Sequence, residues 1–437
     1  MNQTNELTLS VPASAPAALD QEWLRALALK AGADDVGFVS VDREDIASER
    51  EHIFKAFPAT RTLMCIVTRL NVDSVRSPQR SIGNLEFHRN YHHVNEVAAA
   101  IVRELARHKI RAVNPSAAFP MEMDNYPGRI WVIAHKPVAV AAGLGQVGIH
   151  RNIIHPEFGS FINISTVLVA ADVDSESRPI DYNPCFECKL CVAACPVGAI
   201  APDGYFNFSA CFTHNYREFM GGFTDWVETI ADSGGAKALR RKVSDSEQSS
   251  MWQSLSFGAN YKAAYCLAVC PAGTDVIAAY AADKAAYVKH VVDPLADKEE
   301  PLYVVPGSDA EDYAQRRFPH KPLRRVGGGL RPRTIRGLLD GMPLVFQRGK
   351  AKGLTATYHF TFTGVEPRLT TISIRERKLT IADGHVGKAD IAVSTDATAW
   401  LEFLYRERSL PWLLLTRKLR IKGRPSLLTA FGKCFAV

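Results

Sequence analysis

One short stretch carries four cysteines, in the order Cys185-Phe-Glu-Cys188-Lys-Leu-Cys191-Val-Ala-Ala-Cys195-Pro196. The spacing C-x2-C-x2-C-x3-C-P is typical of iron–sulfur proteins, in which the first three thiolates hold one [4Fe–4S] cluster and the fourth ligates a second cluster. Zinc sites instead use two separated cysteine pairs as a rule. The stretch therefore predicts two iron–sulfur clusters, held on a tight loop and the helix that follows it.

Further cysteines downstream complete most of this pattern. Cys211 stands alone, and a shorter run follows at Cys266-Leu-Ala-Val-Cys270-Pro271. The crossover of ligands in two-cluster proteins assigns the seven cysteines to two groups. The first group is Cys185, Cys188, Cys191 and Cys270. The second group is Cys195, Cys211 and Cys266.

The second group is one ligand short. A complete second motif would place a cysteine at position 263, where this chain has Ala263. Three alternatives stay open: a non-cysteine ligand such as His214, an iron with an open position, or a [3Fe–4S] cluster. The choice matters because the ligands of a cluster influence its reduction potential.

The composition is that of an ordinary globular protein. The 437 residues allow two or three domains, and a net charge of +6 is too mild to imply a nucleic-acid partner. The sequence has no run of about 18 apolar residues and no export signal at its start, so we expect no membrane span and a cytoplasmic location. The two remaining cysteines, Cys65 and Cys434, are expected to be small buried hydrophobes.

The pattern divides the chain into five segments with a mixed α+β character. We expect a flexible leader over 1–19, an α/β domain over 20–178, an iron–sulfur module over 179–295, a basic linker over 296–340 and an α+β domain over 341–437. In the first domain, periodicity predicts a helix from Asp20 to Leu29 and another over 94–108. Strands are predicted over 35–41, 62–68, 129–134 and 164–170.

The loop Gly143-x-Gly145-x-x-Gly148 matches the dinucleotide fingerprint in form only. No apolar strand runs directly into Gly143, and no long helix with an acidic residue about 20 positions later follows. Three glycines instead indicate backbone packed closely against a flat or bulky partner.

Two stretches around this loop resemble a known family. They run from His135-Lys-Pro to Ile149-His-Arg151, and from Ile154-His-Pro to Phe158-Gly159. They are similar to reductive dehalogenases and to epoxyqueuosine reductases, and Arg89-Asn-Tyr-His92 resembles the Arg-Asp-Tyr-His run of the latter. The resemblance covers about residues 20–290. It implies a cobalamin-binding, nitroreductase-like domain followed by a ferredoxin-like module with two clusters.

The resemblance also nominates site residues. Those expected at the cofactor are Arg89, Tyr91, His92, Gly143, Leu144, Gly145, Gly148, Gly159 and Asn163. Dehalogenases tend to carry an arginine where this chain has Asn163. The candidates for the acid that protonates substrate are Asp124, Tyr126, His135 and His150. No Asp-x-His-x-x-Gly run is present, so cobalamin would bind without a protein histidine ligand; a flavin in this pocket stays an alternative.

The last third of the chain begins with a basic segment at 316–336, which predicts either contact with phosphates, RNA or an anionic membrane, or a solvated strap between domains. Strands are then predicted over 356–364, 369–375, 378–382 and 389–394, with helices over 397–405 and 426–431. Gly353-Leu-Thr-Ala-Thr-Tyr-His-Phe360 and Leu419-Arg-Ile-Lys-Gly423 resemble the sterol-carrier-protein type 2 domain. Residues that would line its lipid tunnel, or form a plain core, are Trp400, Leu401, Leu404, Trp412, Leu413 and Leu414.

Taken together, these features favour a cytosolic cobalamin-dependent reductase similar to reductive dehalogenases. Electrons would come from an external donor, such as a ferredoxin, a flavodoxin or a reductase, and pass through two clusters to the corrinoid. The substrate is expected to be apolar, and steroid- or lipid-like because of the last domain; nucleic acid is not the expected partner. The alternatives are a tRNA-modifying enzyme like the epoxyqueuosine reductases, and a non-catalytic electron carrier or corrinoid- or lipid-binding protein.

Overall fold

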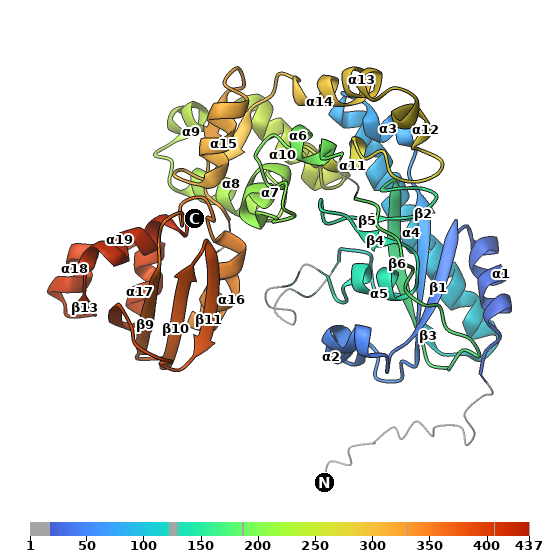
Figure 1. Ribbon diagram of the computed structural model, residues 1–437, viewed down its shortest axis with the longest axis horizontal. Helices are drawn as coiled ribbons and strands as arrows, with labels where there is room; N and C mark the ends of the chain where they lie inside the picture. The colour runs from blue at the N-terminus through green and yellow to red at the C-terminus, as the bar shows by residue number, and fades with distance from the viewer. Residues whose placement is uncertain are drawn as a thin grey trace, which may run out of the picture.

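The computed structural model describes residues 18–120, 122, 129, 131–185, 188–329, 331–405 and 407–436. They form an arch of three regions, with the N-terminal and C-terminal domains at its two feet and the cysteine-rich module across its top (Figure 1). Asp124, Tyr126 and residues 1–17 of the predicted leader lie outside the described residues. Within the described part of the chain, no helix is both long and apolar enough to cross a membrane.

The N-terminal domain is built on an antiparallel sheet whose strand order is β1-β2-β6-β3. Its strands are β1 (Asp35–Ser40), β2 (Thr62–Arg69), β6 (Ile162–Val169) and β3 (Ala112–Val113). Strand β2 is buried along its whole length except at Arg69. A strand buried on both faces reads as a continuous apolar run, which is why the sequence predicted it well.

Helices cover both faces of this sheet. Met64 and Ile66 of β2 pack with α1 (Gln21–Ala31) and α4 (Arg80–Arg107). The alternate residues, Leu63, Cys65 and Val67, pack with residues of α2 (Ala47–Ala56) and α5 (His135–Ala141). Cys65 is thus the small buried hydrophobe that the sequence predicted. The remaining short elements are η1 (Glu44–Ile46), α3 (Val72–Arg76) and a hairpin of β4 (Gln146–Val147) and β5 (Ile153–Ile154).

The predicted boundaries hold where a cap marks them. The Asp20 carboxylate accepts hydrogen bonds from the backbone of Glu22 and Trp23, and Gly32 ends α1 at φ 108°. The helix predicted over 94–108 begins instead at Arg80, so the run from Arg89 to His92 is helical. The strand predicted over 129–134 is wrong in the residues described there, because no strand forms before α5 begins at His135.

The regular elements described in the cysteine-rich module are helices joined by long loops. Its helices are α6 (Leu190–Ala194), α7 (Phe208–Asn215), α8 (Gly221–Ala231), α9 (Ala236–Lys242), α10 (Asp245–Phe257), α11 (Tyr265–Ala268), α12 (Ala278–Ala282), α13 (Lys284–Tyr287), the π-helix η3 (Val288–Val292) and α14 (Asp293–Ala296). Helices α8 to α10 are inserted between the two cysteine runs.

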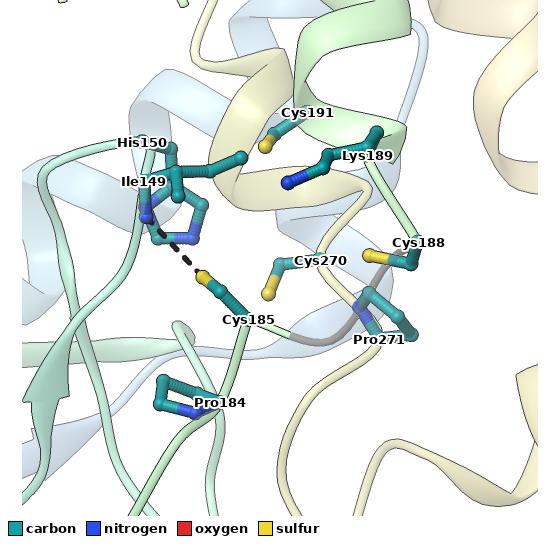
Figure 2. Close-up of a pocket in the computed structure, with 9 residues that line it drawn as sticks. All are labelled: Ile149, His150, Pro184, Cys185, Cys188, Lys189, Cys191, Cys270 and Pro271. Carbon is teal, nitrogen blue, oxygen red and sulfur yellow. Dashed lines mark hydrogen bonds between the residues drawn. The ribbon is translucent and has the colours of Figure 1, made fainter. Parts of the chain in front are cut away.

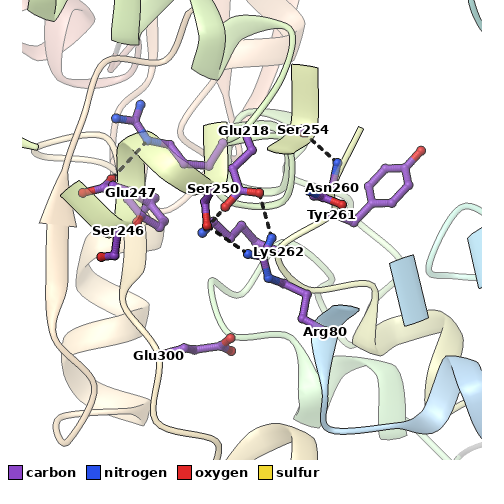
Figure 3. A network of polar contacts seen from close by, with 12 residues as sticks. Arg80, Glu218, Ser246, Glu247, Ser250, Ser254, Asn260, Tyr261, Lys262 and Glu300 are labelled. Atoms are coloured by element: carbon purple, nitrogen blue, oxygen red, sulfur yellow. Dashed lines mark hydrogen bonds and ion pairs between the residues drawn. The ribbon is translucent and has the colours of Figure 1, made fainter. Parts of the chain in front are cut away.

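A buried ionic network ties this insertion to the N-terminal domain (Figure 3). Glu218 accepts a hydrogen bond from Arg80 of α4 at 2.8 Å, and its other oxygen lies 2.5 Å from the Lys262 ammonium. The Glu218 side chain is 3% exposed. Burial alone would raise the pKa of Glu218, but Lys262 and Arg80 together lower it. The carboxylate therefore stays charged and pairs with both cations.

The predicted basic linker is a folded unit rather than a strap. Residues 302–325 form the parallel pair β7 (Leu302–Val304) and β8 (Leu323–Arg325), joined by α15 (Asp309–Arg317). Leu302, Val304 and Ala314 pack in one cluster with Cys195 and Val197. The unit thus covers part of the second group of cysteines.

The C-terminal domain is a five-stranded sheet of order β11-β10-β9-β12-β13. Its elements are α16 (Ile335–Val345), β9 (Ala356–Thr363), β10 (Arg368–Arg375), β11 (Lys378–Asp383), β12 (Ile391–Asp396), α17 (Ala397–Leu404), α18 (Leu410–Leu415), β13 (Leu419–Gly423) and α19 (Pro425–Lys433). Only β12 and β9 pair in parallel among these strands. The four strands and two helices predicted here are confirmed to within a few residues.

The residues proposed to line a lipid tunnel divide into two sets. Trp400 and Leu413 are buried in the core with Phe360 and Phe431. Leu414 is about half exposed and Leu415 of the same helix is 86% exposed. Helix α18 therefore turns one side to the core and presents leucines to solvent on the other.

Polar contacts fix the C-terminal domain to the module. The Tyr205 hydroxyl donates to the Phe346 carbonyl at 3.1 Å, and Arg348 lies 2.7 Å from Asp203. The Asp309 carboxylate of α15 accepts from the backbone of Gly349 and Lys350.

Candidate iron–sulfur centre

The first group of cysteines surrounds one pocket (Figure 2). Cys185 and Cys188 come from the loop before α6, Cys191 from its first turn, and Cys270 from the segment after α11. Lys189 adopts φ 50° where the loop turns into α6. The sharp turn brings three closely spaced cysteines to one side, and tertiary packing adds Cys270 from 79 residues further along the chain.

The second group is gathered around the other ends of the same helices. Cys195 ends α6, Cys211 lies on α7 and Cys266 lies on α11. Burial and then the neighbouring charge of Cys195 raise the pKa of Cys211 to about 12, against the opposing charge of Lys136. The pKa of Cys266 is raised by burial and then by Cys211 and Cys195. The three thiols therefore lie close enough to repel one another when ionised.

Helices α6 and α11 each serve both groups. Cys191 and Cys195 are four residues apart, and so are Cys266 and Cys270. Residues at this spacing lie one helical turn apart on the same face. The pKa of Cys191 is raised by burial first and next by Cys266 of the second group. The two groups are therefore adjacent.

The donor sets fit iron–sulfur clusters. All nine cysteines are free thiols, and the two groups together use seven of them. Buried thiols that repel one another as anions are stabilised by a cationic centre, which deprotonates them when it binds. In the described parts of the chain, no three histidine, cysteine or acidic side chains converge at the distances of a single metal ion. A cluster is larger than an ion, and its thiolates lie further apart around it.

Backbone donors point at the sulfur atoms. The Ile149 N–H donates to Cys185 Sγ at 3.2 Å, and the Ala199 N–H donates to Cys195 Sγ at 3.2 Å. Burial raises the pKa of Cys270 to about 11, although hydrogen bonds from the Ala272 backbone and the Ser160 side chain lower it. Hydrogen bonds to sulfur are one of the factors that set a cluster's reduction potential.

Ala263 stands at the position where a fourth cysteine of the second group is expected. The Ala263 N–H donates to the Asn215 side chain at 2.8 Å, which places this residue beside the end of α7. His214 of α7 is buried, and its Nδ1 accepts from the Tyr303 N–H at 3.2 Å. Burial, together with Lys262, Lys321 and Arg80, lowers the pKa of His214 to about 3. The ring is therefore neutral, as a metal ligand must be.

Lys136 is a cation beside the second group that the sequence alone did not single out. It lies at the start of α5, and its ammonium donates to the Arg151 carbonyl at 2.5 Å. Burial lowers its pKa, while Cys266 and Cys211 oppose the shift. Lys136 belongs to the run that begins at His135, which the sequence analysis singled out. No pattern in the sequence indicated that α5 packs near the cysteines.

The residues nominated on α4 fall on two sides of the helix. Arg89 and His92 are exposed, whereas Tyr91 hydrogen-bonds through its hydroxyl to Ser116 at 2.7 Å. Asn90, which stands where the epoxyqueuosine reductases have aspartate, is buried and accepts from the Thr68 hydroxyl at 2.8 Å. Asn163 of β6 lies opposite Thr68 in the sheet. The structure thus brings two nominated stretches together at one strand pair.

The glycines of the nominated loop pack against the protein's own backbone. A Cβ at Gly143 would lie 2.4 Å from the Arg178 carbonyl oxygen, and one at Gly145 would lie 2.3 Å from that of Ile154. A Cβ at Gly159 would lie 2.0 Å from the Ala272 carbonyl oxygen. Gly148 packs on the side chain of Ile154, and Leu144 is in the sheet's core. The sequence predicted that these glycines pack against a flat or bulky partner. On the side where their Cβ atoms would lie, that partner is the backbone of the same chain.

The two described histidines proposed as acids differ. His135 is buried, with Nδ1 3.0 Å from the Thr166 hydroxyl and Nε2 3.2 Å from the Ser116 carbonyl. Burial lowers the pKa of His135 to about 4, and both ring nitrogens are occupied. Both contacts lie within the N-terminal domain, and a catalytic role for His135 stays a prediction from the sequence. His150 instead lines the first group's pocket (Figure 2).

Two segments match known protein families. Residues 178–201 match the 4Fe-4S binding domain, and residues 346–436 match the SCP-2 sterol transfer family. The resemblances predicted for the cysteine module and the last domain are confirmed by these matches.

Part of the chain is similar to epoxyqueuosine reductases. That of Gloeobacter violaceus is 27% identical over 171 residues, which cover 39% of this chain and 50% of that protein. That of Cellulophaga algicola is 28% identical over 154 residues, covering 33% of this chain and 47% of that one. That of Lactococcus garvieae is 35% identical over 92 residues, covering 21% and 26%. The chain spans about half the length, or less, of these curated relatives.

Solved structures with partial similarity come from the same two enzyme groups. The epoxyqueuosine reductase of Bacillus subtilis superposes with a TM-score of 0.34 at 18% identity, covering 46% of this chain and 57% of that one. A catabolic reductive dehalogenase superposes with a TM-score of 0.33 at 20% identity, covering 41% and 25%. The α+β multidomain class predicted from the sequence is the class observed.

Proposed function

We propose that this chain is an iron–sulfur reductase related to the epoxyqueuosine reductases, in which two adjacent clusters carry electrons between an external donor and the N-terminal domain. One observation carries the proposal: seven cysteines converge into two groups that share α6 and α11. Each of these helices contributes one thiol to each group, so the two clusters lie side by side. Adjacent clusters of this kind form an electron path through the module.

Residues of this chain would hold the two clusters and shield them from water. Cysteine thiolates hold the iron, and the N–H groups of Ile149 and Ala199 offset the negative charge on sulfur. The β7-α15-β8 unit packs over Cys195 and keeps water from the second group. The wall of the first group comes partly from the N-terminal domain, through Ile149 and His150. The first group is therefore the one from which electrons reach that domain.

A dehalogenase-like corrinoid mechanism has less support than the epoxyqueuosine-reductase-like alternative. The sequence similarity is to epoxyqueuosine reductases. The residues nominated for a corrinoid do not form one lining, because Gly143, Gly145 and Gly159 face backbone and Leu144 lies in the core. When bound, cobalamin would supply a strongly reducing metal centre.

Anaerobic reconstitution with iron, sulfide and cobalamin tests the proposal. We expect about seven or eight irons per chain and EPR signals from two interacting clusters. Cys434 is buried outside both groups, so Cys434→Ser is a matched control that keeps the full iron content. Iron content near zero, or equal iron in the wild type and in a Cys188→Ser variant, would refute the iron–sulfur assignment. Cobalt counted in the same sample decides whether the N-terminal domain takes a corrinoid.

The C-terminal domain supports a second, additional function: binding of an apolar ligand. Residues 346–436 match the SCP-2 sterol transfer family, and α18 presents Leu414 and Leu415 to solvent. Exposed leucines of this kind are typical of surfaces that contact lipid. Fluorescent fatty-acid titration of the whole protein should show saturable binding that Leu414→Ser with Leu415→Ser weakens at least several-fold.

The same preparation separates an apolar substrate from an RNA substrate. One related structure is an epoxyqueuosine reductase with an epoxyqueuosine-modified tRNA stem loop. We propose a modified nucleoside in tRNA as the alternative to the apolar, steroid- or lipid-like substrate expected from the sequence. Single-turnover reduction of an epoxyqueuosine-containing stem loop would establish it. Saturable lipid binding without any stem-loop binding would favour the apolar substrate.

A further inference from the structure

His150 occupies an unusual position in the wall of the first group. It lies in the turn between β4 and β5, is 4% exposed, and lines the pocket with the four cysteines. Figure 2 shows its ring between Ile149 and Cys185. The neighbouring Ile149 N–H already donates to Cys185 Sγ at 3.2 Å. The β4–β5 turn therefore places the Ile149 N–H and the His150 ring on the same side of the first group.

The protonation state of the ring follows from its contacts. The Asn152 backbone N–H lies 3.1 Å from Nδ1 and donates to it. A nitrogen that accepts a hydrogen bond carries no proton, so the neutral ring is protonated at Nε2.

The Nε2–H group is a buried donor that lacks an acceptor among the described residues. A buried donor left without a partner is costly, and native proteins rarely keep one without a role. In the pocket that His150 lines, sulfur is the available acceptor, either in a cysteine thiolate or in the sulfide of a cluster.

We propose that His150 is a positioning residue whose Nε2–H donates a hydrogen bond to sulfur in the first group's cluster and raises its reduction potential. The proposal rests on the iron–sulfur function proposed above. Reduction adds negative charge to the cluster, and a donor aimed at its sulfur stabilises the reduced form more than the oxidised form. His150 lines the pocket of the first group, so its donor would act on the first cluster.

Two variants of the full-length protein test the role of the donor. His150→Leu removes the N–H but keeps an apolar side chain of similar size, whereas His150→Gln keeps an amide N–H near the position of Nε2. The measurement is an EPR-monitored redox titration of the reconstituted protein. In His150→Leu we expect the reduction equilibrium of the first cluster to fall about tenfold, a shift of about 59 mV to lower potential for a one-electron couple. In His150→Gln most of the wild-type value should remain, and the second cluster should be unchanged in both.

The outcomes distinguish a failure of the hydrogen-bond proposal from a failure of the iron–sulfur function. If the wild type takes up no iron, the iron–sulfur function fails. If iron content is full and the potential of His150→Leu equals that of the wild type, the hydrogen bond is refuted. Equal shifts in the Leu and Gln variants refute it as well, because they indicate packing.

A second measurement avoids variants that lose the cluster. Wild-type protein labelled with 15N-histidine should show coupling between the reduced first cluster and a histidine nitrogen in pulsed EPR, and His150→Gln should lack it. Absence of this coupling in the wild type would overturn the proposal.

Discussion

The two cysteine groups share two helices but are closed in different ways. The first group has four thiols and a wall supplied by the β4–β5 turn of the N-terminal domain. The second has three thiols, Ala263 where a fourth is expected, and a cover supplied by the β7-α15-β8 unit. The two cysteine runs are similar in sequence, but the fold places the two groups in different environments. Two clusters in unlike environments have different potentials, which gives an electron path a direction.

The largest expected effect tests whether the groups are assigned correctly. Cys270→Ser should remove the first cluster and Cys266→Ser the second, each lowering iron by about half. The reason is that each cube depends on all its thiolates. Iron counts and EPR of the two variants provide the measurement. If both variants lose the same EPR signal, the crossover of ligands, and with it the comparison between the groups, is wrong.

The next effect concerns the polar surroundings that only the second group has. Glu218 holds Lys262 and Arg80, two of the cations that lower the pKa of His214. Glu218→Gln would leave two buried cations without their carboxylate and should cost about 3–5 kcal/mol of unfolding free energy. Urea unfolding followed by circular dichroism measures it.

An exposed ion pair in the same helical insertion is the matched control. Arg240 and Asp245 are mostly exposed and 3.5 Å apart. Arg240→Ala should therefore leave the unfolding midpoint unchanged within error. A similar loss in both variants would show that the Glu218 network contributes no more than a surface pair.

A smaller change would make the two groups alike. Ala263→Cys supplies the missing thiol and should add about one iron per chain if the wild-type second cluster is [3Fe–4S]. The oxidised-state EPR signal of a three-iron cluster should then disappear. Ala263→Ser is the control of similar size without a thiol. If His214 is instead the fourth ligand, Ala263→Cys leaves the iron content unchanged and His214→Ala lowers it.

The smallest expected effect is a dependence on pH confined to the first group's side of the molecule. Asp35 hydrogen-bonds His155 at 3.1 Å, and His155 pairs through its backbone with Gly159, which packs on Ala272 next to Cys270. Burial alone would raise the pKa of Asp35, but hydrogen bonds from His155 and Arg25 lower it overall.

Because the folded-state pKa of Asp35 is depressed, its stabilising contribution is complete above its unfolded pKa of about 3.9 and is lost as pH falls through the folded-state pKa. The unfolding free energies of wild type and Asp35→Asn should therefore differ more at pH 7 than at about pH 3, because part of the contribution is lost below the unfolded pKa. Urea titrations at the two pH values measure this difference. A difference that does not change with pH would exclude a charge contribution from Asp35.

The elements that the sequence predicted well are those with a local signal. Helix α1 has its cap at Asp20 and its end at Gly32, and β9 alternates between buried and more exposed residues from Tyr358 to Thr363. The first three cysteines of the first group are fixed by a loop of seven residues, so their convergence needs no tertiary contact.

The basic segment at 316–336 has ion-pair partners that the sequence did not predict. It has no acidic residue of its own over 316–336, yet Arg325 pairs with Glu311 at 2.6 Å and Arg331 pairs with Glu228. Glu228 lies about a hundred residues away along the chain. The charge that seemed available for phosphates is therefore partly neutralised by partners that only folding brings near. Short strands such as β7 and β8 also lack a periodic signal, because three residues are too few to show one.

By itself, the sequence determined the cysteine spacing from which the two groups of ligands are predicted, the gap at Ala263 and the α+β character of the outer domains. These depend on spacing and periodicity, which act over a few residues. Only the tertiary structure decided that His135 is buried between Thr166 and Ser116, that His150 faces the first group, and that Lys136 stands beside the second. Those assignments depend on burial and on contacts between distant segments, which packing establishes and no local pattern encodes.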